Sequence, residues 1–154
     1  MVSDFDRMAD ELQRQVLADY SDTVIDHAQN PRNVGDIQDA DGFGSITGPC
    51  GDTMEIWLRV KNGIIRQATF WTDGCGTTIA SGSMVTEMAI GKNVVDAMKT
   101  SQQDVLDALG GLPDDSSHCA LLAANTLKEA LKDYLTFKNE PWRKAYRKYR
   151  THIE

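Results

Sequence analysis

Three cysteines are the residues of this chain best suited to chemistry. Cys50 and Cys75 are 25 residues apart (50 to 75), Cys119 follows after another 44 (75 to 119), and no Cys-x-x-Cys pair occurs. Each falls at a predicted junction between a loop and a helix or strand, and glycine neighbours two of them. Structural cysteines usually lie inside the periodic core. The placement therefore favours thiols that bind a soft or borderline metal as thiolates.

Two further donors lie beside these thiols. Asp52 follows Cys50 by two residues, and His118 directly precedes Cys119. Three thiolates are one ligand short of the four that zinc or a small iron–sulfur cluster takes. Either the Asp52 carboxylate or the His118 imidazole can supply the fourth, and a nitrogen or oxygen donor makes the site more exchangeable. The candidate metal ligands are thus Cys50, Asp52, Cys75, His118 and Cys119, with the fourth ligand open. His27 lies on an apolar stripe and is predicted to be a packing residue.

The hydrophobic periodicity predicts the elements that must position these donors. Strands precede most of the helices, which favours an α+β fold. Cys75 and Cys119 both directly precede or open a predicted helix, where the N-terminal dipole favours the thiolate. The predicted strands are 43–47, 53–61 and 64–72, and the predicted helices are 7–29 (with a possible break at 21–22), 77–90, 94–98, 104–109, 119–135 and 141–150.

Residues 53–61 alternate between apolar and polar side chains, which predicts a half-buried strand. Asn62-Gly63 is a strong signal for a hairpin turn after that strand. A two-residue turn in simple register would place Leu58 opposite Gln67 and break the apolar face. We therefore expect either a three-residue loop or a β-bulge in this hairpin.

Composition limits the class of protein. The chain has 154 residues, which suits one domain, and its net charge of −7 argues against a nucleic-acid binder. No apolar run reaches the roughly 18 residues of a membrane span. An odd number of cysteines with no visible export signal predicts reduced thiols and a cytoplasmic location.

The charge is unevenly distributed. Residues 138–154 hold six basic and two acidic side chains and therefore carry a net charge of +4. The rest of the chain carries −11, since the net charge of the whole chain is −7. We expect a main domain over residues 1–136 and a basic, helical C-terminal extension over 137–154. The extension is predicted to dock on the acidic body, with a contact to a partner or a second subunit as the alternative.

Several ordered motifs, found between Tyr20 and Leu135, resemble the IscU/NifU-type iron–sulfur cluster assembly scaffold family. The residues that carry the resemblance are Val24-Ile25-Asp26-His27, Asn30-Pro31-Arg32-Asn33-Val34-Gly35, Gly48-Pro49-Cys50-Gly51-Asp52, Gly74-Cys75-Gly76-Thr77-Thr78-Ile79-Ala80-Ser81-Gly82-Ser83, Leu109-Gly110-Gly111-Leu112-Pro113 and His118-Cys119.

The resemblance implies a three-stranded antiparallel sheet with helices packed on one side and the metal site at an exposed end. It implies that a [2Fe–2S] cluster is assembled from iron and from sulfur supplied by a cysteine desulfurase, and then passed to recipient apo iron–sulfur proteins. Cys50, Cys75 and Cys119 would be cluster ligands, Asp52 a ligand or the group that keeps the cluster labile, and His118 an alternative ligand. The protein would not be an enzyme, Zn²⁺ could occupy the same site, and a homo-oligomer could shield the cluster.

One segment departs from the family pattern. Leu112-Pro113-Asp114-Asp115-Ser116 stands where the family has Leu-Pro-Pro-Val-Lys, which argues against recognition by the dedicated Hsp70-type chaperone. Two alternatives to a scaffold are a SufU-like, zinc-bound persulfide acceptor that stimulates a desulfurase and a small structural zinc domain. The sequence has no obvious insertion before Cys119 and keeps His118, which favours the scaffold over the SufU-like protein.

Overall fold

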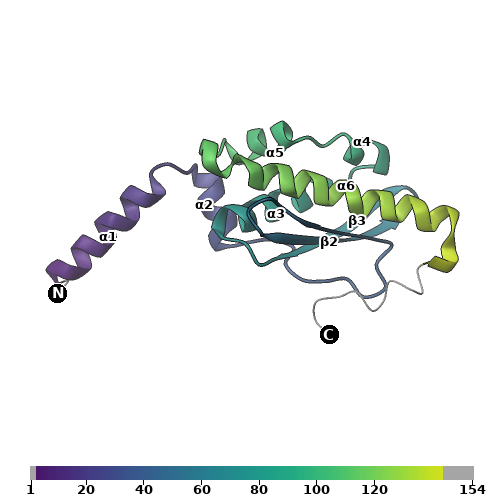
Figure 1. Ribbon diagram of the computed structural model, residues 1–154, viewed down its shortest axis with the longest axis horizontal. Helices are drawn as coiled ribbons and strands as arrows, with labels where there is room; N and C mark the ends of the chain where they lie inside the picture. The colour runs from purple at the N-terminus through teal and green to yellow at the C-terminus, as the bar shows by residue number, and fades with distance from the viewer. Residues whose placement is uncertain (1–2, 144–154) are drawn as a thin grey trace.

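The computed structural model describes residues 3–143, and these form an α+β fold, as predicted (Figure 1). No helix in this range is long and apolar enough to cross a membrane. The elements in chain order are α1 (Asp4–Leu17), α2 (Asp22–Gln29), β1 (Gly42–Thr47), β2 (Thr53–Lys61), β3 (Ile64–Thr72), α3 (Gly76–Ala89), α4 (Val94–Met98), α5 (Gln102–Leu109), the 3₁₀ turn η1 (Asp114–Ser116), α6 (Ser117–Asn139) and the 3₁₀ turn η2 (Pro141–Arg143).

The three strands form one antiparallel sheet in the order β1-β2-β3. Asn62 and Gly63 both have positive φ, at 56° and 74°, as a two-residue type I′ turn requires. The register shifts between Arg59 and Val60, so that Leu58 faces Ala68. The bulge, one of the two expected solutions, thus keeps the apolar face of the hairpin continuous.

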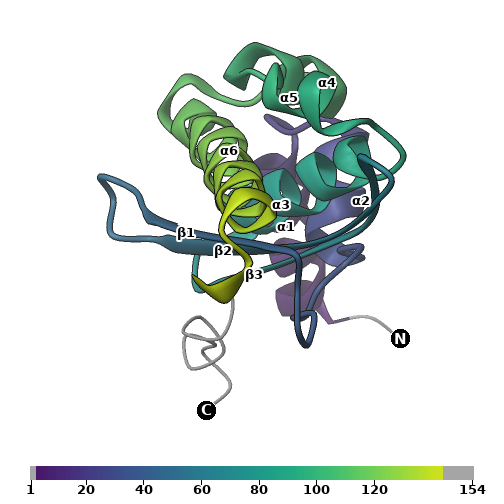
Figure 2. The same ribbon diagram turned by 90° about the vertical axis from the view of Figure 1, so that its right-hand side faces the viewer.

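Helices cover one face of the sheet, also as predicted (Figure 2). α6 packs on β1 and β2, and α3 packs on β3. The even-numbered residues of β2, Met54, Ile56 and Leu58, are fully buried against these helices together with Phe70. This layer is the main hydrophobic core.

The prediction that β2 is only half-buried is wrong. Glu55 and Trp57, on the other face of the strand, are 8% and 2% exposed. After α2 the chain hydrogen-bonds to the edge of β3, where Gly35 N donates to Phe70 O, and then passes to the start of β1. Ile37 and Ala40 of this passage pack against Trp57 in a second, smaller cluster. Alternation along one strand could not reveal a cover supplied by a loop.

The approach of α6 to β1 depends on glycine. A Cβ on Gly44 would lie only 2.5 Å from Ala130 N, and one on Gly42 would lie 2.5 Å from Ala130 O. Gly48, beyond the end of β1, faces Leu122 instead, so α6 runs antiparallel to β1. The first turn of α6 is therefore brought to the end of the sheet where β1 leads into β2.

Other boundaries differ from the expected ones. The helix expected over 7–29 is divided into α1 and α2, and Ser21 caps α2 by accepting from Val24 N at 3.1 Å. α6 begins at Ser117, two residues before the expected start at Cys119, so Cys119 lies within its first turn, and α6 continues to Asn139. The helix expected over 141–150 begins with η2, and its remainder lies outside the described residues.

Candidate metal centre

Three segments meet at one end of the sheet. The β1–β2 loop is closed by two hydrogen bonds, from Gly48 N to Asp52 O at 2.8 Å and from Gly51 N to Gly48 O at 3.0 Å. The β3–α3 connection is tied to it because Thr53 N donates to Asp73 Oδ1 at 2.8 Å. The first turn of α6 is the third segment. These segments carry all five predicted ligands, which are 2, 23, 43 and 1 positions apart in the chain.

Thr78, in the first turn of α3, lies at the centre of the donors. Its hydroxyl donates to Asp52 Oδ2 at 3.2 Å and lies 3.4 Å from Cys119 Sγ and 3.9 Å from Cys75 Sγ. The Thr78 side chain is fully buried. One hydroxyl thus contacts a carboxylate and two sulfurs from three different segments.

Thr77 adds a second link between the sulfurs. Its hydroxyl lies 3.3 Å from Cys75 Sγ and 3.5 Å from Cys119 Sγ. His118 Nε2 lies 3.7 Å from Cys119 Sγ. Four of the five predicted donors, Asp52, Cys75, His118 and Cys119, are therefore connected through short contacts.

Cys50 is the fifth predicted donor. It lies exposed in the β1–β2 turn, and Cys75 is exposed as well, whereas Cys119 is buried at 2% exposure. Across residues 3–143 no three His, Cys, Asp or Glu side chains are arranged to hold one metal ion. The described residues thus bring Asp52, Cys75, His118 and Cys119 near one another and show no hydrogen bond from Cys50 to any of them.

The surroundings of Cys75 favour its thiolate. Cys75 is the N-cap residue of α3. The hydroxyl of Thr77 lowers the pKa of Cys75 most, burial opposes this, and the backbone N–H groups of Thr78 and Thr77 lower the pKa further. Hydrogen bonds to the charged form stabilise it. Cys75 is thus an exposed thiol whose deprotonated form is favoured.

The absence of a side chain at Gly74 leaves the space in which Thr78 and Asp52 meet. A Cβ at this position would lie 2.6 Å from Thr78 Cβ and 2.8 Å from Asp52 Oδ2. A glycine beside a cysteine lets backbone amides approach a bound sulfur. At Gly74 the contact between Thr78 and Asp52 is a further reason.

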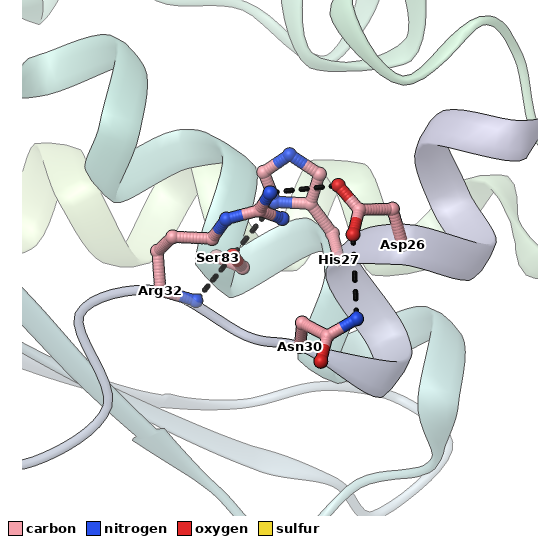
Figure 3. A network of polar contacts seen from close by, with 5 residues as sticks. All are labelled: Asp26, His27, Asn30, Arg32 and Ser83. Carbon is pink, nitrogen blue, oxygen red and sulfur yellow. Dashed lines mark hydrogen bonds and ion pairs between the residues drawn. The ribbon is translucent and has the colours of Figure 1, made fainter.

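The predicted packing histidine belongs to a separate network (Figure 3). His27 Nδ1 lies 2.7 Å from Ser83 Oγ, and the same oxygen accepts from Arg32 N at 2.9 Å. Arg32 also forms a 2.7 Å ion pair with Asp26, which accepts from Asn30 Nδ2 as well. Burial lowers the pKa of His27. The motif from Asp26 to Arg32 therefore fastens α2 and its following loop to α3, the helix whose N-cap residue is Cys75.

Sequence reasoning missed Thr77 and Thr78. A β-branched residue is a poor choice for helix stability alone, and two hydroxyls two and three positions after a cysteine at a helix start were the available signal. Their contacts to Asp52 and Cys119, however, span 26 and 41 positions. No local pattern specifies such contacts.

Comparison with known proteins places this fold and site in a family. The family model described as the NifU-like N-terminal domain matches residues 19–141. The iron-sulfur cluster assembly scaffold protein IscU 1 of Archaeoglobus fulgidus is 52% identical over 116 residues, which cover 75% of this chain and 76% of that protein. The IscU scaffold protein of Escherichia coli is 43% identical over 120 residues, covering 75% of this chain and 93% of the relative.

The structural comparison agrees. The crystal structure of a NifU-like protein (N-terminal) from Brucella abortus superposes with a TM-score of 0.63 at 16% identity, covering 79% of this chain and 97% of that one. At that identity the likeness concerns the fold alone. The sequence relatives and the family model together show that this chain belongs to the family of NifU-like N-terminal domains, which includes the IscU scaffolds.

Proposed function

We propose that this protein is a scaffold for iron–sulfur cluster assembly. Iron and sulfide are its substrates, and the finished [2Fe–2S] cluster is cargo that leaves for a recipient. The observation that carries the proposal is the meeting of Cys75, Cys119 and Asp52 around the Thr78 hydroxyl. Relatives whose names describe them as cluster assembly scaffolds, at 43% and 52% identity, support the same function.

In this proposal the thiolates of Cys50, Cys75 and Cys119 bind iron, and Asp52 or His118 supplies the fourth donor. Two sulfurs and a carboxylate around the Thr78 hydroxyl, with an imidazole beside Cys119, suit iron and also zinc, so Zn²⁺ can occupy the same donors. A carboxylate binds iron less tightly than a thiolate. The Asp52 position can therefore open when the cluster leaves, which suits a carrier more than an enzyme that turns over.

The partners follow from this chemistry. A cysteine desulfurase supplies sulfur and apo iron–sulfur proteins receive the cluster, and both must reach the exposed thiols of Cys50 and Cys75. A second copy of the chain can shield the same thiols. The cytoplasm is the proposed location, because the thiols must stay reduced. Asp114 and Asp115 in η1 replace the residues of the family's chaperone segment, so the proposal includes no dedicated Hsp70-type partner.

Anaerobic reconstitution with ferrous iron and sulfide tests the function. The wild-type protein should gain visible sulfide-to-iron charge-transfer absorption, with matching iron and acid-labile sulfide contents. Cys75→Ala should lose most of this absorption, and Thr126→Val should keep it, because the Thr126 hydroxyl contacts only Leu122 O within its own helix.

Two results would contradict the proposal: a wild-type protein that stays colourless, or a Cys75→Ala protein that reconstitutes as well as wild type. A protein that holds only zinc and yet stimulates a desulfurase would support the SufU-like alternative, which the names of the relatives favour less.

A further inference from the structure

We propose that Thr78 is a positioning residue that orients the Asp52 carboxylate as a metal donor. The proposal rests on the proposed function in that it takes this site to be the one that receives iron. It concerns a residue that touches the donor and not the cluster itself.

The hydrogen bond of Thr78 differs from those of Thr126 and Ser81, two other buried hydroxyls in the helices. Thr126 and Ser81 each donate to the backbone carbonyl four residues earlier in their own helix, at 2.7 and 2.8 Å. Thr78 instead donates to Asp52 Oδ2, which belongs to the β1–β2 loop. Helical threonines often bond to the carbonyl four residues earlier, whereas the Thr78 hydroxyl bonds to a candidate metal donor in another segment.

The direction of the bond decides what Asp52 can do. A hydroxyl can donate only one hydrogen bond, and that of Thr78 donates to Asp52 Oδ2. Among the described residues, no hydrogen bond reaches Asp52 Oδ1. One carboxylate oxygen is thus held and the other is left for a metal. Cys119 Sγ, 3.4 Å from the Thr78 oxygen, lies beside that carboxylate.

The space around the pair supports the same conclusion. A Cβ on Gly74 would lie 2.7 Å from Thr78 Oγ1 and 2.8 Å from Asp52 Oδ2, so any side chain there would displace one of the two. Thr78 is also fully buried, which limits competition from water at its end of the bond. The pair is therefore a fixed feature of the fold and not a chance surface contact.

Groups that hold a metal ligand in place usually contribute about 10–100-fold to metal affinity. We expect Thr78→Val, which keeps the shape and removes the hydroxyl, to weaken Co²⁺ binding by about that factor. Thr78→Ser should restore binding, and Thr126→Val, the matched loss of a buried hydroxyl in α6, should leave it unchanged. The sulfur-to-cobalt charge-transfer band should persist in Thr78→Val at saturating Co²⁺, because the sulfurs still bind.

A double-mutant cycle separates orientation from packing. If Thr78 acts through the carboxylate, Thr78→Val should add nothing further to the weakened Co²⁺ binding of Asp52→Ala. Equal Co²⁺ affinity in Thr78→Val and wild type would overturn the proposal. The full Thr78→Val loss persisting on the Asp52→Ala background would overturn it too. Circular dichroism checks folding, and Thr78→Ala replaces the valine variant in the same cycle if valine does not fold.

The outcome for the proposed function is separate. A wild-type protein that binds Co²⁺ in a Thr78-dependent way but forms no cluster would contradict the scaffold function and leave this inference standing. A wild-type protein that forms a cluster while its Co²⁺ binding ignores Thr78 would contradict only the inference.

Discussion

The packing of α6 on β1 can be tested at Gly44. α6 carries His118 and Cys119 in its first turn, so its distance from the sheet determines where these donors lie. A Cβ on Gly44 would meet Ala130 N at 2.5 Å and Thr126 O at 2.7 Å. Both are backbone atoms of a helix, which cannot rotate away as a side chain can. Gly44→Ala should therefore push α6 off the sheet or strain β1.

The size of the effect follows from these contacts. Ordinary van der Waals contact begins at 3.4 Å, so the 2.5 Å contact requires the helix backbone to move by about 0.9 Å. Overpacking of a core costs about 1–3 kcal/mol, and displaced backbone suggests the upper end. Part of this cost is offset, because alanine in place of glycine restricts the unfolded chain and so adds about 0.4–1 kcal/mol to the free energy of unfolding. We expect a net loss of about 2 kcal/mol, which for a chain of this size lowers Tm by about 4–8 °C.

Urea unfolding followed by tryptophan fluorescence measures this loss, since Trp57 is buried in the sheet. The midpoint should fall while the slope m stays constant, because the surface exposed on unfolding is unchanged. Gly48→Ala is the matched control: its Cβ would lie 3.7 Å from Leu122, an ordinary contact, and it should change stability by less than about 0.5 kcal/mol. If Gly44→Ala proved as stable as Gly48→Ala, the close approach of α6 to β1 would be refuted.

Three further predictions concern single residues. Asp52→Ala should lengthen the lifetime of a reconstituted cluster, because the exchangeable oxygen donor is gone; decay of the visible absorption in the presence of a chelator measures it, and an equal or shorter half-life contradicts it. Thr77→Val should raise the pKa of Cys75, because the hydrogen bond from the Thr77 hydroxyl is lost. The rate of Cys75 alkylation, measured by peptide mass spectrometry, should then rise at a higher pH than in wild type, and Thr77→Ser should restore the wild-type profile. An unchanged pH profile in Thr77→Val would argue against the hydrogen bond. Burial lowers the pKa of His27, so as the pH falls the unfolded chain binds the extra proton before the folded chain does, and stability should fall below about pH 6.5, the usual histidine value. Urea midpoints measured at several pH values should show this dependence in wild type and a flatter one in His27→Gln. Equal pH dependence in both proteins would contradict the prediction.

Much of the scaffold follows from local sequence. The type I′ turn at Asn62-Gly63 follows from residue chemistry, because these two residues tolerate positive φ. A departure from simple register could also be expected, because Leu58 needs an apolar partner, but the choice of a bulge over a three-residue loop came from the structure. Apolar periodicity likewise located α3, α4 and the body of α6 to within a few residues.

The candidate site was predicted in part. The positions of Cys50, Asp52, Cys75, His118 and Cys119 beside glycines and helix starts marked them as donors. The sequence did not predict how deeply each donor is buried, because Cys119 is buried by the packing of the whole α6 helix and not by its neighbours in sequence. Trp57 is buried for a similar reason, because Ile37 and Ala40 of the segment between α2 and β1 pack against it.

The sequence by itself therefore identified the candidate metal donors and the local elements that carry them, because turn chemistry, capping and periodicity act over a few residues. Only the tertiary structure decided that Thr78 stands between Asp52 and Cys119. That arrangement depends on the register of β1 on β2 and on the glycines that let α6 and the β3–α3 connection approach. Contacts between residues 26 and 41 positions apart arise from packing, which no short stretch of the chain encodes.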